Sequence, residues 1–228
     1  LLPSTRKNID EMFAEVTALM HSLEHPAAKA LSAAYLDDAK LMEDFRIAPA
    51  AMQIHHAWIG GLLEHTLQLM KLADAMLPNY PRLNRDIILF SLFIHDLGKV
   101  EELRWDRGFE YTREGNLIGH IARGAMWLEE KAKIAEANLG EPLPDGFLTV
   151  MQHIVLSHHG LLEHGAVKLP ATPEAIFVSQ LDNLDAHTQT ALDSARPWVK
   201  TAVGDEAFTE RLWSLNTKLY RKDPLQPS

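Results

Sequence analysis

The segment from Ile87 to Ile94 is apolar on every side of a helix and leads directly into His95 and Asp96. A helix without a polar face belongs in the centre of a core, because no side of it can face water. An imidazole and a carboxylate at its end are costly to bury without a partner. Either Asn84 or Asp86 can cap its start. The segment therefore predicts a central buried helix that delivers two polar side chains to an internal site.

Most of the remaining chain shows apolar residues at spacings of three and four, which is typical of amphipathic helices. The polar stretch 104–112 is expected to be a loop, with a short hairpin around Arg107 and Gly108. Pro26 and Pro173 favour helix starts. The predicted fold class is all-α. The expected helices cover Asp10–Glu24, Pro26 to at least Met42 with a limit at Pro49, Trp58–Met76, Gly115–Asn138, Asp145–Ser157, and a segment that begins at Thr172.

The 228 residues, 46% of them hydrophobic, suit one globular domain with a small appendage. We expect a helical lead-in over 1–50 packed on the core, the main domain over 51–205 and a C-terminal tail over 206–228. The apolar run 87–94 is far shorter than the roughly 20 residues that span a bilayer, and no signal peptide is evident, so no membrane association is expected. The chain begins with Leu1, which leaves room for an upstream domain in the full gene product. Nothing in the pattern indicates an oligomeric state.

Charge and cysteine content restrict the possible functions. The chain carries 22 basic and 31 acidic residues, a net charge of −9. This balance argues against a broad basic face that grips duplex nucleic acid, although bound cations can supply local positive charge. The absence of cysteine excludes disulfides and thiolate metal sites, which leaves nitrogen and oxygen ligands. It also fits a reducing cytoplasm, which is the expected location.

Seven imidazole and carboxylate side chains are candidate metal ligands: His65, His95, Asp96, His120, His158, His159 and Asp182. The adjacent pair reaches one site only where the backbone turns, because successive helical residues point about 100° apart, and Gly98 allows this turn. The carboxylate of the pair can bridge two cations. One ion would then be bound by His65, His95, Asp96 and Asp182. The other would be bound by His120, His158 and His159, with Asp96 shared between the two. Each residue alone is equally well explained by a structural role, so the prediction depends on the set.

One or two divalent ions held in this way predict phosphoester chemistry. Mixed nitrogen and oxygen ligation suits Mn²⁺, Fe²⁺, Mg²⁺, Ni²⁺ or Zn²⁺. Two ions about 3.5–4 Å apart activate a bridging water and stabilise the leaving oxygen during in-line attack on phosphorus. Lys99 lies one turn past the His-Asp pair and can bind a phosphate oxygen as a point charge. Asp96 and Lys99 are therefore the candidate catalytic residues.

Three further residues are candidates for contact with the substrate. His56 precedes the helix of His65 and can lie at the site mouth, although packing or surface exposure explains it as well. Arg123 lies one turn after His120 and can reach a phosphate, or it can be an ordinary surface arginine. Asp185 lies three residues after Asp182 on the same helix face, where it can support the ligands or be solvated.

The segments around these residues resemble a known enzyme family. Leu62-Leu63-Glu64-His65-Thr66 and His95-Asp96-Leu97-Gly98-Lys99 resemble motifs of the HD-domain metal-dependent phosphohydrolases. The chain also resembles the catalytic domain of the YhaM-type 3′→5′ exoribonucleases, over roughly residues 4 to 220. The segments that carry this resemblance are residues 55–66, 80–86, 111–120, 152–160 and 181–186.

This resemblance implies an HD-domain helical bundle, metal binding by the seven ligands with manganese favoured, and single-stranded RNA or DNA shortened from its 3′ end. That family carries an N-terminal OB domain that binds nucleic acid. Residues 1–50 show a helical pattern instead. Such a domain is therefore expected either upstream of this chain or not at all.

Three hypotheses for the function follow. The first is a divalent-metal phosphohydrolase that cleaves phosphodiester bonds as a 3′→5′ exonuclease on single strands. The second is a phosphohydrolase of small nucleotides or nucleoside monophosphates, which the acidic balance favours if no OB domain exists. The third is a degenerate HD module that binds a nucleotide or a protein partner without turnover. The intact ligand set argues against the third, because a degenerate site usually loses ligands.

Overall fold

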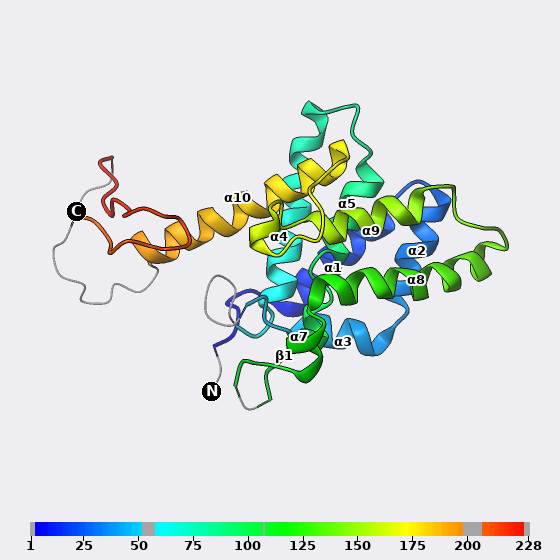
Figure 1. The fold of residues 1–228 in the computed structure, drawn as a ribbon, viewed down its shortest axis with the longest axis horizontal. Helices are drawn as coiled ribbons and strands as arrows, with labels where there is room; N and C mark the ends of the chain where they lie inside the picture. Colours follow the sequence, from blue (N-terminus) through cyan, green and yellow to red (C-terminus); the bar gives the residue numbers. More distant parts are fainter. Residues whose placement is uncertain (1–2, 52–57, 107, 198–206, 226–228) are drawn as a thin grey trace. The chain divides into compact units, whose positions relative to one another are not determined.

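The computed structural model describes residues 3–51, 58–106, 108–197 and 207–225 (Figure 1). The chain divides into a first unit, Leu1–Asp182, and a second unit, Asn183–Ser228. The helices before residue 50 contribute buried side chains to the same core cluster as the helices after residue 60. The sequence-based boundaries at residues 50 and 205 stay predictions.

Helices make up most of the described chain, which confirms the all-α prediction. Its small sheet pairs Leu103 with Tyr111 and Arg104 with Glu110 in antiparallel register, which confirms the expected hairpin. None of the described helices combines the length and hydropathy needed to cross a bilayer. The elements are α1 (Ile9–His21), α2 (Pro26–Leu36), α3 (Ala39–Ile47), α4 (Gly61–Met76), η1 (Leu77–Asn79), α5 (Arg85–Ile94), α6 (Lys99–Glu102), β1 (Leu103–Arg104), β2 (Glu110–Tyr111), α7 (Arg113–Leu117), α8 (His120–Leu139), α9 (Phe147–Ser157), η2 (Leu162–His164) and α10 (Pro173–Ala195).

Three expected helices differ from the observed ones at points where a local conformation interrupts the apolar pattern. The helix expected to continue from Pro26 through Met42 ends at Leu36, and the Asp38 side chain accepts from the Leu41 N–H to cap α3. The helix expected over 115–138 is broken at Gly119, whose φ of +78° separates α7 from α8. The helix expected from Trp58 begins only after Gly60, which has a φ of +80°. Aspartate caps and left-handed glycines override apolar periodicity because they end the backbone hydrogen-bond ladder.

Helix α5 lies at the centre of the first unit, as its apolar sequence predicts. Every residue from Ile88 to Ile94 is buried. The ring of Phe90 packs edge-on against Tyr35 of α2 at 5.7 Å, and the ring of Phe93 packs against Phe45 of α3 at the same distance. Burial of each such side chain contributes about 1.5–3 kcal/mol. This packing holds the C-terminal end of α5 in a fixed place.

Asp86 joins α5 to the turn between α1 and α2. Its Oδ2 accepts hydrogen bonds from the backbone N–H groups of Glu24 at 2.9 Å and His25 at 2.7 Å. Asn84, not Asp86, caps α5, because its side chain accepts from the Ile87 N–H. Asp86 is therefore a packing residue of the N-terminal helices.

Substitution of Asp86 by alanine is expected to lower the free energy of unfolding by about 2–3 kcal/mol, because two backbone N–H groups lose a charged acceptor. Urea unfolding followed by circular dichroism measures the loss. Asp86→Asn keeps an acceptor oxygen and should cost less. A loss below about 0.5 kcal/mol for Asp86→Ala, the level of an ordinary surface substitution, would contradict this role.

Candidate metal centre

The seven side chains that the sequence singles out as ligands meet at one place in the first unit. Their ligand atoms form two groups, and within each group all atoms lie within 4.8 Å of one another. One group is Asp96, His120, His158 and His159, and the other is His65, His95 and Asp182. They come from α4, the turn after α5, the start of α8, the end of α9 and α10. The tertiary fold thus gathers residues that are more than one hundred positions apart in the chain.

Asp96 belongs to the first group with its Oδ1 and faces the second group with its Oδ2. Its Oδ2 is 3.5 Å from His95 Nε2 and 3.8 Å from His65 Nε2. Its Oδ1 is 3.3 Å from His120 Nε2 and 3.4 Å from His158 Nε2. A carboxylate in this position suits a ligand shared by two cations.

Four histidines of the cluster are held by hydrogen bonds that fix their tautomers. Because carbonyl and carboxylate oxygens only accept, each Nδ1 carries the proton, and each Nε2 keeps a free lone pair. The four Nε2 atoms are therefore the ring nitrogens that are able to bind a cation. His95 donates to Leu92 O at 2.8 Å, and His158 donates to Val155 O at 2.7 Å. His159 donates to His164 O at 2.7 Å, and His120 donates to Glu102 Oε1 at 2.9 Å.

Unsatisfied acceptors are concentrated at the centre of the cluster. Of the buried side-chain polar atoms in the described part of the chain, eight lack a hydrogen-bond partner, and four of them are His95 Nε2, Asp96 Oδ1, His120 Nε2 and His158 Nε2. With the tautomers above, all four are acceptors, and acceptors at this range repel one another. Such an arrangement is costly unless a positive charge lies among them. The donor set, nitrogen and oxygen without sulfur, fits a divalent cation.

The protonation states also suit metal ligation. Burial lowers the pKa of His95 to about 4, and burial likewise lowers the pKa of His159 to about 4, so both imidazoles are neutral near pH 7. Burial alone would raise the pKa of Asp96, but the Lys99 ammonium 2.7 Å away holds that pKa well below its usual range. Burial would lower the pKa of Lys99, and the Asp96 carboxylate outweighs it, so that pKa is raised. The carboxylate is therefore ionised, as a metal ligand must be.

Glu102, at the end of α6, is a functional candidate that the sequence did not reveal. Its Oε1 accepts from the His120 Nδ1–H at 2.9 Å and from the His120 backbone N–H at 3.0 Å. It therefore fixes both the ring and the start of α8. The sequence offers one weak signal, a carboxylate one turn after Lys99. Glu101 and Glu102 are adjacent, however, and only the packing of α6 against α8 distinguishes them.

Substitution of Glu102 by alanine is expected to weaken metal binding at the His120 group by about 10–100-fold, because the ring loses the partner that orients it. Calorimetric titration with Mn²⁺ measures this affinity. Glu101→Ala is the matched control, since that more exposed carboxylate pairs with Arg123 instead. Identical isotherms for the two variants would contradict the role of Glu102.

The remaining residues that the sequence predicts to contact substrate are Lys99, Arg123, Asp185 and His56. Lys99 engages Asp96, and the Nε of Arg123 lies 2.7 Å from a carboxylate oxygen of Glu101. Asp185 is buried on α10, in the second unit. His56 lies outside the described residues. Binding of substrate by these four residues stays a prediction.

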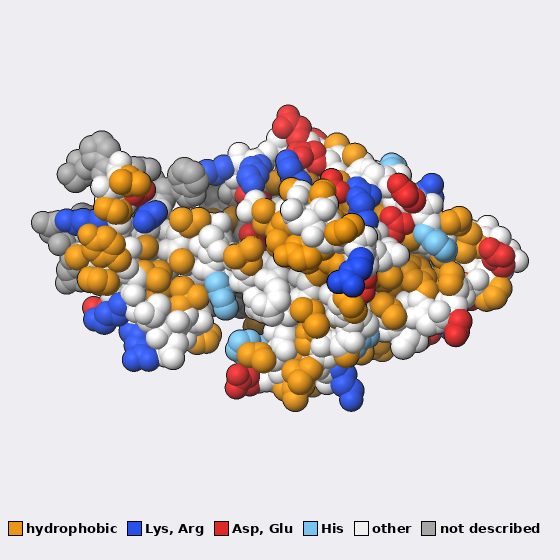
Figure 2. All heavy atoms as spheres, turned by 90° about the horizontal axis from the view of Figure 1, so that it is seen from above, with side chains coloured by type: hydrophobic (Ala, Val, Ile, Leu, Met, Phe, Trp, Pro, Cys, Tyr) orange, Lys and Arg blue, Asp and Glu red, His pale blue; other side chains and the backbone are white. Residues whose placement is uncertain are grey.

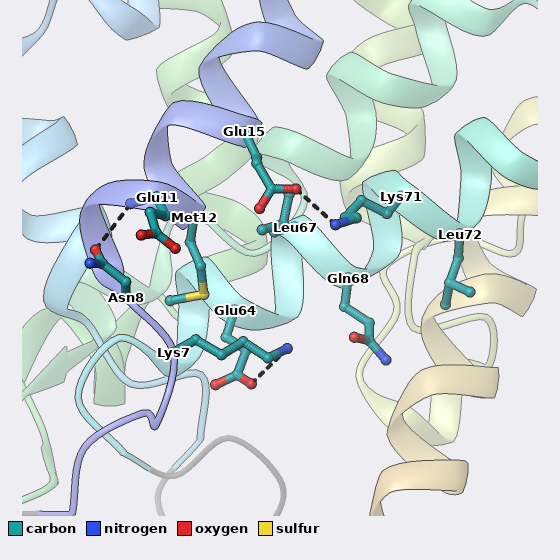
Figure 3. A pocket seen from close by; sticks show the side chains of 10 residues that line it. All are labelled: Lys7, Asn8, Glu11, Met12, Glu15, Glu64, Leu67, Gln68, Lys71 and Leu72. Carbon is teal, nitrogen blue, oxygen red and sulfur yellow. Dashed lines mark hydrogen bonds and ion pairs between the residues drawn. The ribbon is translucent and has the colours of Figure 1, made fainter.

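A separate groove of about 470 Å³ lies beside α1 and α4 (Figure 3). Four of its charged side chains form two ion pairs: Lys7 lies 3.1 Å from Glu64, and Lys71 lies 2.7 Å from Glu15. Glu64 also accepts from the Thr5 hydroxyl at 2.7 Å, so it anchors the segment before α1 although it is next to His65 in sequence. The residues that line the groove are not those of the histidine cluster, and its two ion pairs favour a structural role.

Comparison with known proteins gives an independent view of the same region. The sequence model of the HD domain matches residues 62–187, a range that contains all seven cluster residues. The chain is 36% identical over 214 residues to the 3'-5' exoribonuclease YhaM of Listeria innocua, and 36% identical over 213 residues to that of Geobacillus sp. strain WCH70. It is 38% identical over 183 residues to that of Bacillus pumilus. No solved structure matches significantly.

The alignments with these relatives cover most of this chain but only part of theirs. They include 93% of this chain for Listeria and Geobacillus, and 80% for Bacillus pumilus. The shares of the relatives' own lengths are 64%, 62% and 55%, in the same order. The chain thus spans less than two thirds of these curated relatives.

Proposed function

The chain belongs to the HD-domain family, and on this premise we propose that it is a divalent-metal-dependent phosphohydrolase that cleaves phosphodiester bonds. The observation that carries the proposal is the carboxylate of Asp96, whose two oxygens face different groups of acceptors, most of them buried. A cluster of this kind requires a cation for electrostatic balance. Phosphodiester hydrolysis is the chemistry that two neighbouring cations serve well.

Each cluster residue has a defined role in this proposal. The two ligand groups would hold one ion each, with Asp96 shared, and the neutral imidazoles would bind through Nε2. Ions bound there supply a nucleophilic water at neutral pH and neutralise charge on the phosphate. We favour Mn²⁺, and the ligand types also accept Fe²⁺, Mg²⁺, Ni²⁺ or Zn²⁺.

Lys99 is the proposed contact to the phosphate. Its ammonium is protonated, lies 2.7 Å from Asp96 Oδ2 and is 17% exposed, more than either partner imidazole of that oxygen. A compact ammonium next to the ligands can hold a phosphate oxygen as a point charge. The side chains of His120 and Asp182 keep 12% and 15% of their surface exposed, whereas His95 and His158 are fully buried.

For the substrate, we propose single-stranded RNA or DNA shortened from its 3′ end. The support is the name of the relatives, which are 3'-5' exoribonucleases similar over most of this chain. A chain without cysteine that acts on nucleic acid also fits the reducing cytoplasm, which we propose as its location.

A degradation assay tests this function. The purified chain is incubated with Mn²⁺ and a 5′-labelled single-stranded RNA of mixed sequence, beside Asp96→Ala and an EDTA control. A descending ladder that is absent in both controls supports a 3′→5′ exonuclease. An intact RNA after prolonged incubation with Mn²⁺ overturns that substrate for this chain.

The acidic balance of 22 basic and 31 acidic residues favours one alternative function, hydrolysis of small nucleotides. A small substrate needs no extended basic surface, whereas a polymer usually does. The same preparation is therefore assayed with nucleoside monophosphates and with bis(p-nitrophenyl) phosphate. Release of inorganic phosphate from monophosphates, with the RNA intact, would favour the alternative function.

A further inference from the structure

Residues 207–221 of the second unit form an antiparallel hairpin, here called the C-terminal hairpin. Isolated bridges pair Phe208 with Tyr220 and Leu212 with Thr217. The Leu212 N–H donates to Thr217 O at 2.9 Å, and Asn216 occupies the turn with a φ of +53°. The backbone of this segment is thus ordered by its own hydrogen bonds, although it lies outside the metal centre.

The C-terminal hairpin exposes three large aromatic side chains. Trp213 is 83% exposed, and Phe208 and Tyr220 are 50% and 49% exposed. The rings of Phe208 and Tyr220 contact each other, with centroids 5.3 Å apart. Exposed aromatic area of this size is uncommon in a folded unit and marks an interaction surface.

The same segment of the chain also carries exposed basic side chains. Arg211, Lys218 and Lys222 are exposed, and residues 207–225 carry four basic and two acidic side chains. This positive balance is opposite to that of the whole chain, which has 22 basic and 31 acidic residues. In Figure 2, hydrophobic side chains and Lys or Arg side chains lie next to each other on this unit, at the left of the view. The segment that carries the exposed rings therefore has a net positive charge.

We propose that the C-terminal hairpin binds single-stranded nucleic acid. Bases stack on Trp213 and on the pair formed by Phe208 and Tyr220, while Lys218 and Lys222 contact phosphates. Stacking accepts any base because every base has a π-face, and cations attract the backbone regardless of sequence. Such a surface suits an enzyme that must hold a strand of mixed sequence. The choice of RNA as the ligand rests on the proposed exonuclease function.

The charge of the hairpin favours a nucleic acid over a protein partner. Lysine is depleted at protein–protein interfaces, whereas this segment carries exposed Lys218 and Lys222 together with its aromatic rings. The negative charge of a phosphodiester backbone complements these basic side chains. Docking of a protein or of a second copy is an alternative outcome of the test.

Binding of a fluorescein-labelled 12-nucleotide single-stranded RNA to the full chain tests the proposal by anisotropy. EDTA is present so that no cleavage occurs. Trp213→Ala is expected to weaken binding by about 5- to 150-fold, the range found for loss of a stacking platform, whereas Trp213→Phe should recover most of it. Because Trp213 is 83% exposed, the substitution leaves the fold intact. Tyr80→Ala, which removes a half-exposed ring of the first unit, is the matched control.

A charge variant gives a second measurement. Lys218→Gln is expected to reduce the slope of log affinity against log salt by about 0.7, the value for one phosphate contact on a single strand. Lys133→Gln, an exposed lysine of α8, should leave the slope unchanged. Equal slopes for Lys218→Gln and the wild type would overturn the phosphate contact.

The outcomes separate this proposal from the proposed function. Weaker RNA binding by Trp213→Ala, with unchanged hydrolysis of bis(p-nitrophenyl) phosphate, supports the hairpin. If the wild type binds RNA through Trp213 but never cleaves it, the exonuclease function fails and the hairpin stands. RNA affinity that is unchanged in Trp213→Ala overturns the hairpin even if RNA is cleaved. A change of oligomeric mass in that variant, with RNA affinity unchanged, overturns it in favour of a protein interface.

Discussion

Replacement of Asp96 by asparagine is expected to reduce kcat for phosphodiester hydrolysis by at least about 10³-fold, because metal-ion stabilisation supplies several kcal/mol of the barrier reduction. The variant also replaces one anionic oxygen with an amide nitrogen that donates rather than accepts. The carboxylate faces both ligand groups, so a single substitution affects both. Calorimetric titration with Mn²⁺ should therefore show loss of binding together with loss of activity.

Asp86→Asn is the matched control for this prediction. It makes the same chemical change in another buried carboxylate, at the opposite end of α5, whose partners are backbone N–H groups of the preceding turn. This variant should keep the Mn²⁺ stoichiometry and the activity, with any effect confined to the free energy of unfolding. Full activity of Asp96→Asn, or equal inactivation of both variants, would contradict the assignment of Asp96 as the shared ligand.

Substitution of Gly98 by alanine is expected to have the second largest effect, a combined loss of stability and of metal binding at the His120 group. A β-carbon at Gly98 would lie 2.3 Å from the carbonyl oxygen of His120 and 2.9 Å from its Cα. Both atoms belong to the backbone, so no side-chain rotation relieves the contact, and α8 must move away from α6. Overpacking of this kind costs about 1–3 kcal/mol or more, and the movement withdraws His120 from Asp96. Thermal unfolding and Mn²⁺ titration measure the two effects.

Gly140→Ala serves as the control because its cost has a different origin. Gly140 has a φ of +73°, and a β-carbon there would meet no atom within 4 Å. A side chain at such a position is strained by about 1–2 kcal/mol through the backbone alone. The two variants should thus lose comparable stability, but only Gly98→Ala should lose metal affinity. Wild-type Mn²⁺ affinity in Gly98→Ala would show that α6 and α8 separate without disturbing the ligands.

Local sequence was sufficient for much of the helical fold. The apolar segment before His95 predicts a central buried helix because hydrophobic periodicity and its absence are properties of neighbouring residues. Local hydrogen-bond chemistry likewise predicted the start of α10 at Pro173 and limited the cap of α5 to Asn84 or Asp86, and the structure shows that Asn84 is the cap. The breaks at Asp38 and Gly119 were missed because the apolar spacing continues across them, although the backbone does not.

The sequence by itself also determined which side chains are able to bind a cation, since residue type sets the donor atoms and the absence of cysteine restricts them to nitrogen and oxygen. Only the tertiary structure decided how these atoms face one another. It directed the two oxygens of Asp96 toward different groups and placed Glu102 against His120. Those relations join residues from separate helices, and they arise from packing around α5, which local periodicity does not encode.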